Sequence, residues 1–238
     1  MLLTDQLTTD AIDSEIKALN PTKNKIGFDS EIAIQGAWNL KSSSHSLLFK
    51  LVDVAHLNAN IPKNTTKLIF KGNKPYAGDT LDFSGIKAMG VRYQQIAVGW
   101  QYQPTPNSVF FALLSYVNGE QYFDADIERS WLYTSKLGDT LSTSIRGAGS
   151  ISDTGRTGFG VNNGSGAAID FGFHTQFGGE ESIWDFDFAV NNLGLVQWSS
   201  KTLNIDVDSN YTWRGIEIDD ITNINGQFAE NELSDSLA

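Results

Sequence analysis

Long stretches of this chain alternate between apolar and polar residues with a period of two. The clearest stretch runs from Tyr122 to Tyr133, and its apolar phase contains Phe123, Ala125, Ile127, Trp131 and Tyr133. The opposite phase contains Asp124, Asp126 and Glu128. Successive side chains of a β-strand point to opposite faces of the sheet. The stretch therefore predicts a strand with one apolar face and one acidic face.

The same period returns along most of the sequence and predicts an all-β fold. Strands are expected at about 25–39, 46–54, 81–103, 108–118, 122–133, 141–145, 167–177, 184–191 and 203–218. A change of phase near Gln94 indicates a bulge or a break between two strands. The dipeptide Asn118-Gly119 is a strong hairpin signal. Together these features predict an antiparallel up-and-down meander of about nine or ten long strands.

Other segments lack this alternation. Residues 5–19 have weakly helical spacing that Pro21 ends, and a short helix is expected near 62–71, before Gly72. Residues 150–166 are rich in Gly, Ser, Asn and Thr and predict a long exposed loop. We therefore divide the chain into a polar, partly helical segment at 1–24, a β-region at 25–218 and a polar acidic tail at 219–238.

Strand length and turn pattern favour a membrane-spanning barrel over a soluble β-sandwich, which alternates in the same way. Many alternating stretches run for about 9 to 13 residues, and a tilted membrane-crossing strand needs about 9 to 11. Tight turns after Gln103, Asn118 and Phe177 contrast with the long loop, and aromatic residues gather near strand ends. Arg129 is an exception, because it falls in the apolar phase, where a charge at the bilayer midplane is costly.

The composition argues against nucleic acid as a partner and excludes chemistry that depends on cysteine. The net charge of −11 argues against a basic surface that binds nucleic acid. The chain has no cysteine, which excludes disulfides and thiolate metal sites. No apolar run is long enough for a spanning helix, and the first 20 residues lack the features of a secretory signal.

Several segments, in this order and spacing, resemble a known family. They are Ile61-Pro62-Lys63, Leu68 to Asn73, Gly78 to Gly85, Tyr116-Val117-Asn118-Gly119 and Ala168 to Gly172. They are similar to a large family of outer-membrane β-barrels in Bacteroidota that is known only as a domain of unknown function and is distantly porin-like or fatty-acid-transporter-like. The resemblance implies a bacterial outer-membrane location and lipid as the partner. Members of the family begin earlier and continue further, so we expect the chain to be an internal piece of an incomplete barrel.

The acidic phase supplies the candidate functional residues, and we expect them to face the lumen. They are Asp124, Asp126, Glu128, Asp185 and Asp187. Paired carboxylates also suit a glycosidase, but lining a wet interior is the simpler interpretation. Asp206, Asp208 and Asn210 fit part of a calcium-loop template, yet Tyr211 stands where that loop needs glycine.

We therefore expect no enzyme activity, no cofactor and no resident metal. The first hypothesis is an outer-membrane barrel with a porin-like or transport-like role. Protein partners at the outer membrane are left open. The alternative hypothesis is a soluble β-sandwich that binds carbohydrate through Trp100, Trp184 and Trp213.

Overall fold

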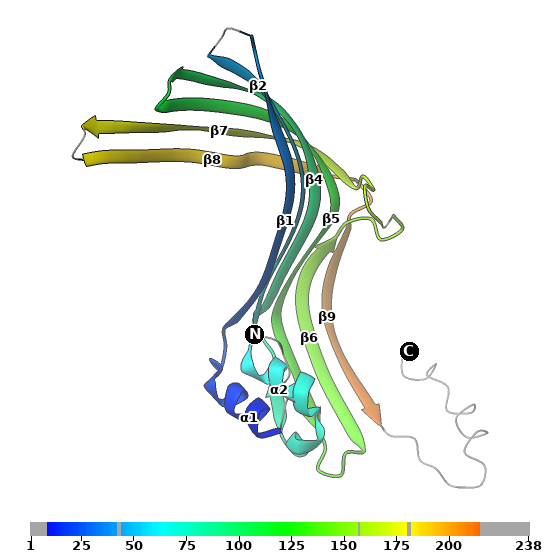
Figure 1. The fold of residues 1–238 in the computed structure, drawn as a ribbon. Helices are drawn as coiled ribbons and strands as arrows, with labels where there is room; N and C mark the ends of the chain where they lie inside the picture. The colour runs from blue at the N-terminus through cyan, green and yellow to red at the C-terminus, as the bar shows by residue number, and fades with distance from the viewer. Residues whose placement is uncertain (1–8, 42–43, 157, 180–181, 215–238) are drawn as a thin grey trace.

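A computed structural model describes residues 9–41, 44–156, 158–179 and 182–214. These residues are mostly β and antiparallel, as the alternation predicts (Figure 1). The strands are β1 (Asn24–Asn39), β2 (His45–Ile61), β3 (Thr80–Asp82), β4 (Ile86–Thr105), β5 (Ser108–Thr134), β6 (Thr140–Ile151), β7 (Gly164–Gly179), β8 (Ser182–Trp198) and β9 (Leu203–Arg214). The helices are α1 (Thr9–Ala18) and α2 (Lys63–Lys71), followed by the 3-10 turn η1 (Lys74–Tyr76).

The nine strands form one sheet in which β1, β2, β4 and β5 are neighbours in that order. Strand β5 has different neighbours along its two halves. Its first half pairs with β7, which pairs with β8, and its second half pairs with β6, which pairs with β9. The position next to β5 is therefore shared by β7 and β6, and the position beyond it is shared by β8 and β9. This arrangement modifies the simple meander that the sequence predicts.

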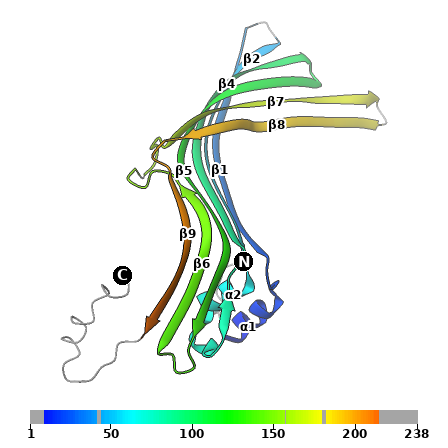
Figure 2. The same ribbon diagram turned by 180° about the vertical axis from the view of Figure 1, so that it is seen from behind.

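The long strands give the sheet two distinct ends (Figures 1 and 2). Strands β1, β4 and β7 end, and β2, β5 and β8 begin, at one end of the sheet, here named the turn end. Helices α1 and α2 lie at the other end, the helix end. In both views the turn-end halves of the strands sweep away from the helix-end halves. Among the described residues β1 pairs only with β2, and β8 pairs only with β7, so this part of the sheet is open.

The sheet has one apolar face and one polar face. On the apolar face many large side chains are exposed, including Ile34, Ile96 and Leu114. The opposite face, here named the polar face, carries the buried Gln95, Ser115 and Asp170 together with small apolar residues. Cross-strand register keeps each set on its own side across neighbouring strands.

The hairpin predicted at Asn118-Gly119 is wrong, because β5 runs straight through it. Strand β4 pairs with β5 on both sides of this point, and the register shifts by one residue at Arg92 and Tyr93. The extra residue on β5 is Glu120, which makes the dipeptide part of a β-bulge. The phase change expected near Gln94 coincides with this bulge.

The faces predicted for the stretch from Tyr122 to Tyr133 are wrong at its C-terminal end, because β5 contains a second bulge there. The pairing of β5 with β6 shifts between Ile127 and Arg129. Trp131 and Tyr133 therefore leave the face of Phe123 and lie with Arg129 over a hollow lined by Thr80 and Ser142. Arg129 pairs with Asp208 at 3.1 Å, so it belongs to the polar side of the sheet and not to the apolar phase.

The helical segments agree with the sequence pattern. Helix α2 ends at Gly72, whose φ of 67° is the left-handed conformation that glycine adopts readily. Asn64 of α2 donates a hydrogen bond to the carbonyl of Asp82, and Lys71 pairs with Asp13 of α1. None of the helices in the described residues is long and apolar enough to cross a membrane.

The loop predicted at 150–166 is shorter than expected, spanning 152–163 between β6 and β7. It also contains Asn163, which is buried rather than exposed. The predicted last strand is described only as far as Arg214, and the predicted acidic tail at 219–238 lies outside the described residues.

Candidate functional site

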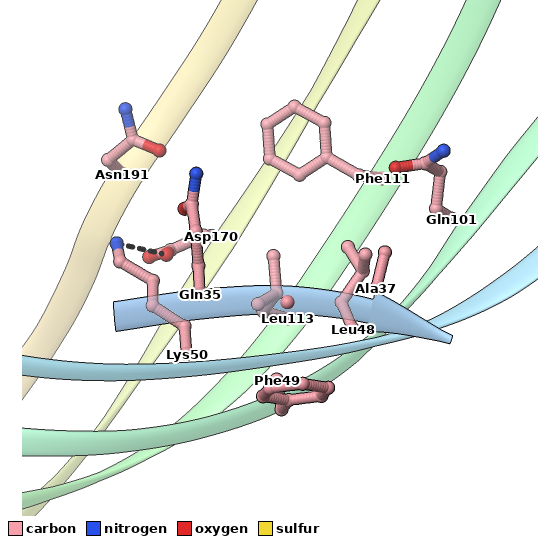
Figure 3. A pocket seen from close by; sticks show the side chains of 11 residues that line it. Gln35, Ala37, Leu48, Phe49, Lys50, Gln101, Phe111, Leu113, Asp170 and Asn191 are labelled. Carbon is pink, nitrogen blue, oxygen red and sulfur yellow. Dashed lines mark hydrogen bonds and ion pairs between the residues drawn. The ribbon is translucent and has the colours of Figure 1, made fainter. Parts of the chain in front are cut away.

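One hollow of the polar face lies in the turn-end half of the sheet. It has a volume of about 490 Å³ and draws residues from β1, β2, β4, β5, β7 and β8. Its polar lining consists of Gln35, Lys50, Gln101, Asp170 and Asn191. Figure 3 shows Lys50 and Asp170 pointing toward each other within this group. We name this hollow the polar trough.

An ion pair lies within the polar trough. The Nζ atom of Lys50 is 3.3 Å from Oδ2 of Asp170, and their side chains are 15% and 2% exposed. The other carboxylate oxygen of Asp170 accepts a hydrogen bond of 2.7 Å from the backbone N–H of Asn192. A buried carboxylate needs such partners, because leaving it unpaired away from water is costly.

The rest of the trough combines neutral amides with apolar surface. Gln35, Gln101 and Asn191 offer both hydrogen-bond donors and acceptors, while Leu48, Phe111 and Leu113 supply apolar contact. The paired Lys50 and Asp170 add no net charge. This lining suits an uncharged polar solute or a water path more than a strongly charged ligand.

The predicted acidic residues of β5 lie outside the trough, in the helix-end half. Asp126 pairs with Lys87 of β4 at 2.6 Å, and Glu128 pairs with Arg146 of β6 at 3.4 Å. Asp124 accepts a hydrogen bond of 2.7 Å from the Tyr122 hydroxyl. Lys87 and Arg146 neutralise Asp126 and Glu128, whereas Asp124, among the described residues, has only the hydrogen bond from Tyr122. The surroundings of all three resemble a solvated polar wall.

Asp185 and Asp187 of β8 lie in the turn-end half, beside His174 of β7. The Nδ1 atom of His174 is 2.8 Å from Asp187 and 3.3 Å from Asp185. Ligand atoms of the three residues lie within 4.8 Å of one another, a donor set of one imidazole and two carboxylates. Both carboxylates are exposed, and the hydrogen bond between His174 and Asp187 accounts for the arrangement.

The structure thus separates the five predicted residues into two groups on different halves of the sheet. Sequence reasoning missed Lys50 and Asp170 as a pair, because their contact depends on the order of β2, β4, β5 and β7. Asp170 did give a signal, because it is the one carboxylate in the polar phase of its strand. Nothing in the pattern of β2 indicated which side chain would meet it.

Comparison with known proteins gives a family match. The model of a family described as "Family of unknown function (DUF5723)" matches residues 3–238. A search of curated proteins and a search of solved structures found no match.

Proposed function

The chain belongs to the family of unknown function DUF5723, and we propose that it is an outer-membrane β-barrel protein of Bacteroidota with a porin-like or transport-like role. One observation carries the proposal: six neighbouring strand positions expose apolar side chains on one face and place amides and a buried ion pair on the other. A barrel in a membrane needs this arrangement, since lipid lies outside and water or solute inside.

Two further features support the same function. The described residues form a single sheet, whereas the soluble β-sandwich alternative needs a second sheet against the apolar face. Large apolar residues also remain exposed on that face over β1, β2, β4, β5, β7 and β8. Soluble monomers rarely expose contiguous apolar patches of such extent, because they promote association.

The polar face would line the path. In the trough the Lys50–Asp170 pair is electrically neutral, and the chain as a whole carries a net charge of −11. The negative net charge disfavours anions by repulsion. The proposed path therefore favours uncharged polar solutes and cations, and no catalytic chemistry is proposed.

Flotation with phospholipid vesicles tests the membrane role. The full chain, refolded in the presence of vesicles, should rise with the lipid through a density gradient. Recovery of a folded, monomeric chain in the lipid-free fraction would instead favour the soluble alternative. Binding to a glycan array that is lost with Trp100→Ala, Trp184→Ala and Trp213→Ala would establish that alternative directly.

Swelling of the same vesicles tests transport. Vesicles containing the chain should swell faster in an isosmotic uncharged sugar than in the salt of a large organic anion. A variant that enlarges the trough, Phe111→Ala, should raise the swelling rate. Leu137→Ala is the matched control, since Leu137 lies in the β5–β6 turn and is 89% exposed.

A further inference from the structure

The apolar face is not uniform along the strands, and cross-strand register divides it into rows. One row in the turn-end half crosses six strands with mostly bulky residues: Gly36, Phe49, Val98, Leu114, Ile169 and Leu193. The next row toward the helix end is Ile34, Leu51, Ile96, Tyr116, Ala167 and Leu195. Leu114 and Leu195 are 61% and 73% exposed, so these side chains face outward without a partner in the described residues.

The helix-end half of the same face is less evenly apolar. It contains one bulky row, with Phe28, Leu57, Phe123 and Leu203 exposed, and the row beyond it is small. This small row crosses six strands and reads Ile26, Ala59, Ala88, Ala125, Gly149 and Ile205. Four of these six residues are alanine or glycine, so each offers little apolar surface. Contact with hydrocarbon would therefore stabilise this small row less than the bulky rows of the turn-end half.

A polar row separates the two halves. It consists of Asp53, Gln94, Asn118, Ser165 and Gln197, which are paired across β2, β4, β5, β7 and β8, and its member on β1 is the apolar Ile32. Gln94 donates to Asp53 at 2.9 Å, and Asn118 donates to Gln94 at 2.8 Å. The network continues into the 152–163 loop, where Asn162 donates to Asn118 at 2.6 Å and to Ser165 at 3.0 Å.

Charged groups adjoin this row on its helix-end side. Arg92 lies 3.3 Å from Asp53 and 3.6 Å from Glu120, and its own side chain is 37% exposed. An arginine on the lipid face is costly at the bilayer midplane and tolerated near the interface. The polar row and Arg92 therefore fit the headgroup level and not the hydrocarbon.

The length of the bulky half matches a bilayer. On β7 the apolar-face positions run from Ala167 to Phe177, ten steps that span about 33 Å at about 3.3 Å per residue. A strand tilted by about 45° would cover roughly 23 Å of membrane height, close to the apolar band of about 25 Å around outer-membrane barrels. Exposed Trp38 and Trp184 lie near the turn end, where an interfacial aromatic belt would be.

We infer that only the turn-end half of the apolar face contacts lipid hydrocarbon, and that the polar row marks the bilayer boundary. The helix-end half, with α1, α2 and the 152–163 loop, then projects beyond the membrane. This inference rests on the proposed membrane location and specifies which surface the lipid occupies.

Single-cysteine labelling tests the boundary, because the chain has no cysteine of its own. Leu114→Cys and Leu193→Cys place a bimane label in the turn-end half, and Ala125→Cys and Ile205→Cys place it in the helix-end half. The labelled full chains are reconstituted in phosphatidylcholine vesicles that contain nitroxide on the acyl chain. A water-soluble nickel chelate is the second quencher, and resistance to protease confirms that each variant is folded.

We expect lipid nitroxide to quench the labels at 114 and 193 at least about twofold more than those at 125 and 205, because only hydrocarbon-facing groups meet acyl chains. The nickel chelate should give the reverse order. Equal lipid quenching at all four positions, or stronger quenching at 125 and 205, would overturn the boundary while leaving the membrane role intact. Failure of every folded variant to float with vesicles would overturn the membrane role itself. Val98→Cys replaces either turn-end variant that does not fold.

Discussion

Lys50 of β2 and Asp170 of β7 form an ion pair across two intervening strands, with 3.3 Å between Nζ and Oδ2. The residues that lie between them on the polar face are small. Lys50 is opposite Ala97, Ala97 is opposite Ser115, and Ser115 is opposite Ala168. Because these side chains are small and the sheet is curved, the lysine reaches over β4 and β5 to the Asp170 carboxylate on β7.

Replacing Lys50 by methionine should destabilise the protein by about 3 kcal/mol, since it leaves the Asp170 carboxylate buried without its countercharge. The Asp170 carboxylate would keep the hydrogen bond that it accepts from the backbone N–H of Asn192. Denaturant unfolding of the chain in detergent micelles, followed by circular dichroism, measures the change.

The exposed pair of Lys87 and Asp126 is the matched control for this prediction. Their side chains are 66% and 49% exposed, so Lys87→Met should cost less than about 1 kcal/mol. The double variant Lys50→Met/Asp170→Leu should recover part of the loss, because no buried charge remains. A cost for Lys50→Met equal to that for Lys87→Met would contradict the assigned role of the pair.

Gly119 lies where β5 packs closely against side chains of β8, so a larger residue there should lower stability. A Cβ atom at this residue would lie 2.8 Å from the ring of Trp198 and 2.9 Å from Val196. Gly119→Ala should therefore overpack the contact between β5 and β8 and destabilise the protein by about 1–3 kcal/mol. Thermal unfolding compares it with Gly27→Ala, whose Cβ would meet only the Leu57 carbonyl oxygen at 3.4 Å. Equal melting temperatures for the two variants would count against this packing.

Sequence alternation predicted the fold class well because burial repeats with the strand period. The apolar faces of Ile34, Ile96 and Leu114 follow from that period alone. It failed at bulges, where one extra residue reverses the side of every later side chain. The bulge between Ile127 and Arg129 is such a place, and it moved Trp131 and Tyr133 to the other face.

The candidate site was less predictable than the fold, since it depends on contacts between distant segments. Lys50 and Asp170 are 120 residues apart in sequence. Their meeting requires β7 to pair with the first half of β5, which in turn requires β5 to continue through Asn118-Gly119. A local signal at that dipeptide favours a turn, and the pairing of β4 along both halves of β5 overrides it.

The turn between β5 and β6, at the helix end, contains a carboxyl group that should make stability depend on pH. The Ser135 hydroxyl donates a hydrogen bond of 2.5 Å to Asp139, and this bond is the main cause that lowers the pKa of the Asp139 carboxyl. A carboxyl whose pKa is lowered on folding contributes stability at neutral pH and loses it as the pH falls through its folded pKa. Ser135→Ala should raise the Asp139 pKa toward its usual value, as measured by a carbon-13 carboxyl titration.

The control for this titration is Ser150→Ala, since the Ser150 hydroxyl bonds the Asn204 amide and no carboxylate. That variant should leave the Asp139 titration unchanged. Stability should also fall less between pH 7 and pH 3 in Ser135→Ala than in the unaltered chain. A wild-type titration curve for Asp139 in Ser135→Ala would mean that another group sets its pKa.

Asn163 anchors the 152–163 loop over the middle of the sheet. Its side chain is buried, and its amide donates to the carbonyl of Glu120 at 2.8 Å and to that of Arg156 at 3.0 Å. The amide also donates a longer bond of 3.5 Å to the carbonyl of Asp153. Asn163→Ala removes these bonds, which should free the loop and let trypsin cleave more readily after the exposed Arg156. If opening becomes easier by about 1.4 kcal/mol, cleavage there should speed up roughly tenfold.

Mass spectrometry of the fragments during a brief digestion in vesicles measures that rate. Asn204→Ala is the control, because its side chain accepts only an exposed hydrogen bond from Ser150. Cleavage after Arg156 should be as slow in the control as in the unaltered chain. The same slow rate in Asn163→Ala would mean that the loop is held by Asn162, whose amide bonds Asn118 and Ser165, rather than by Asn163.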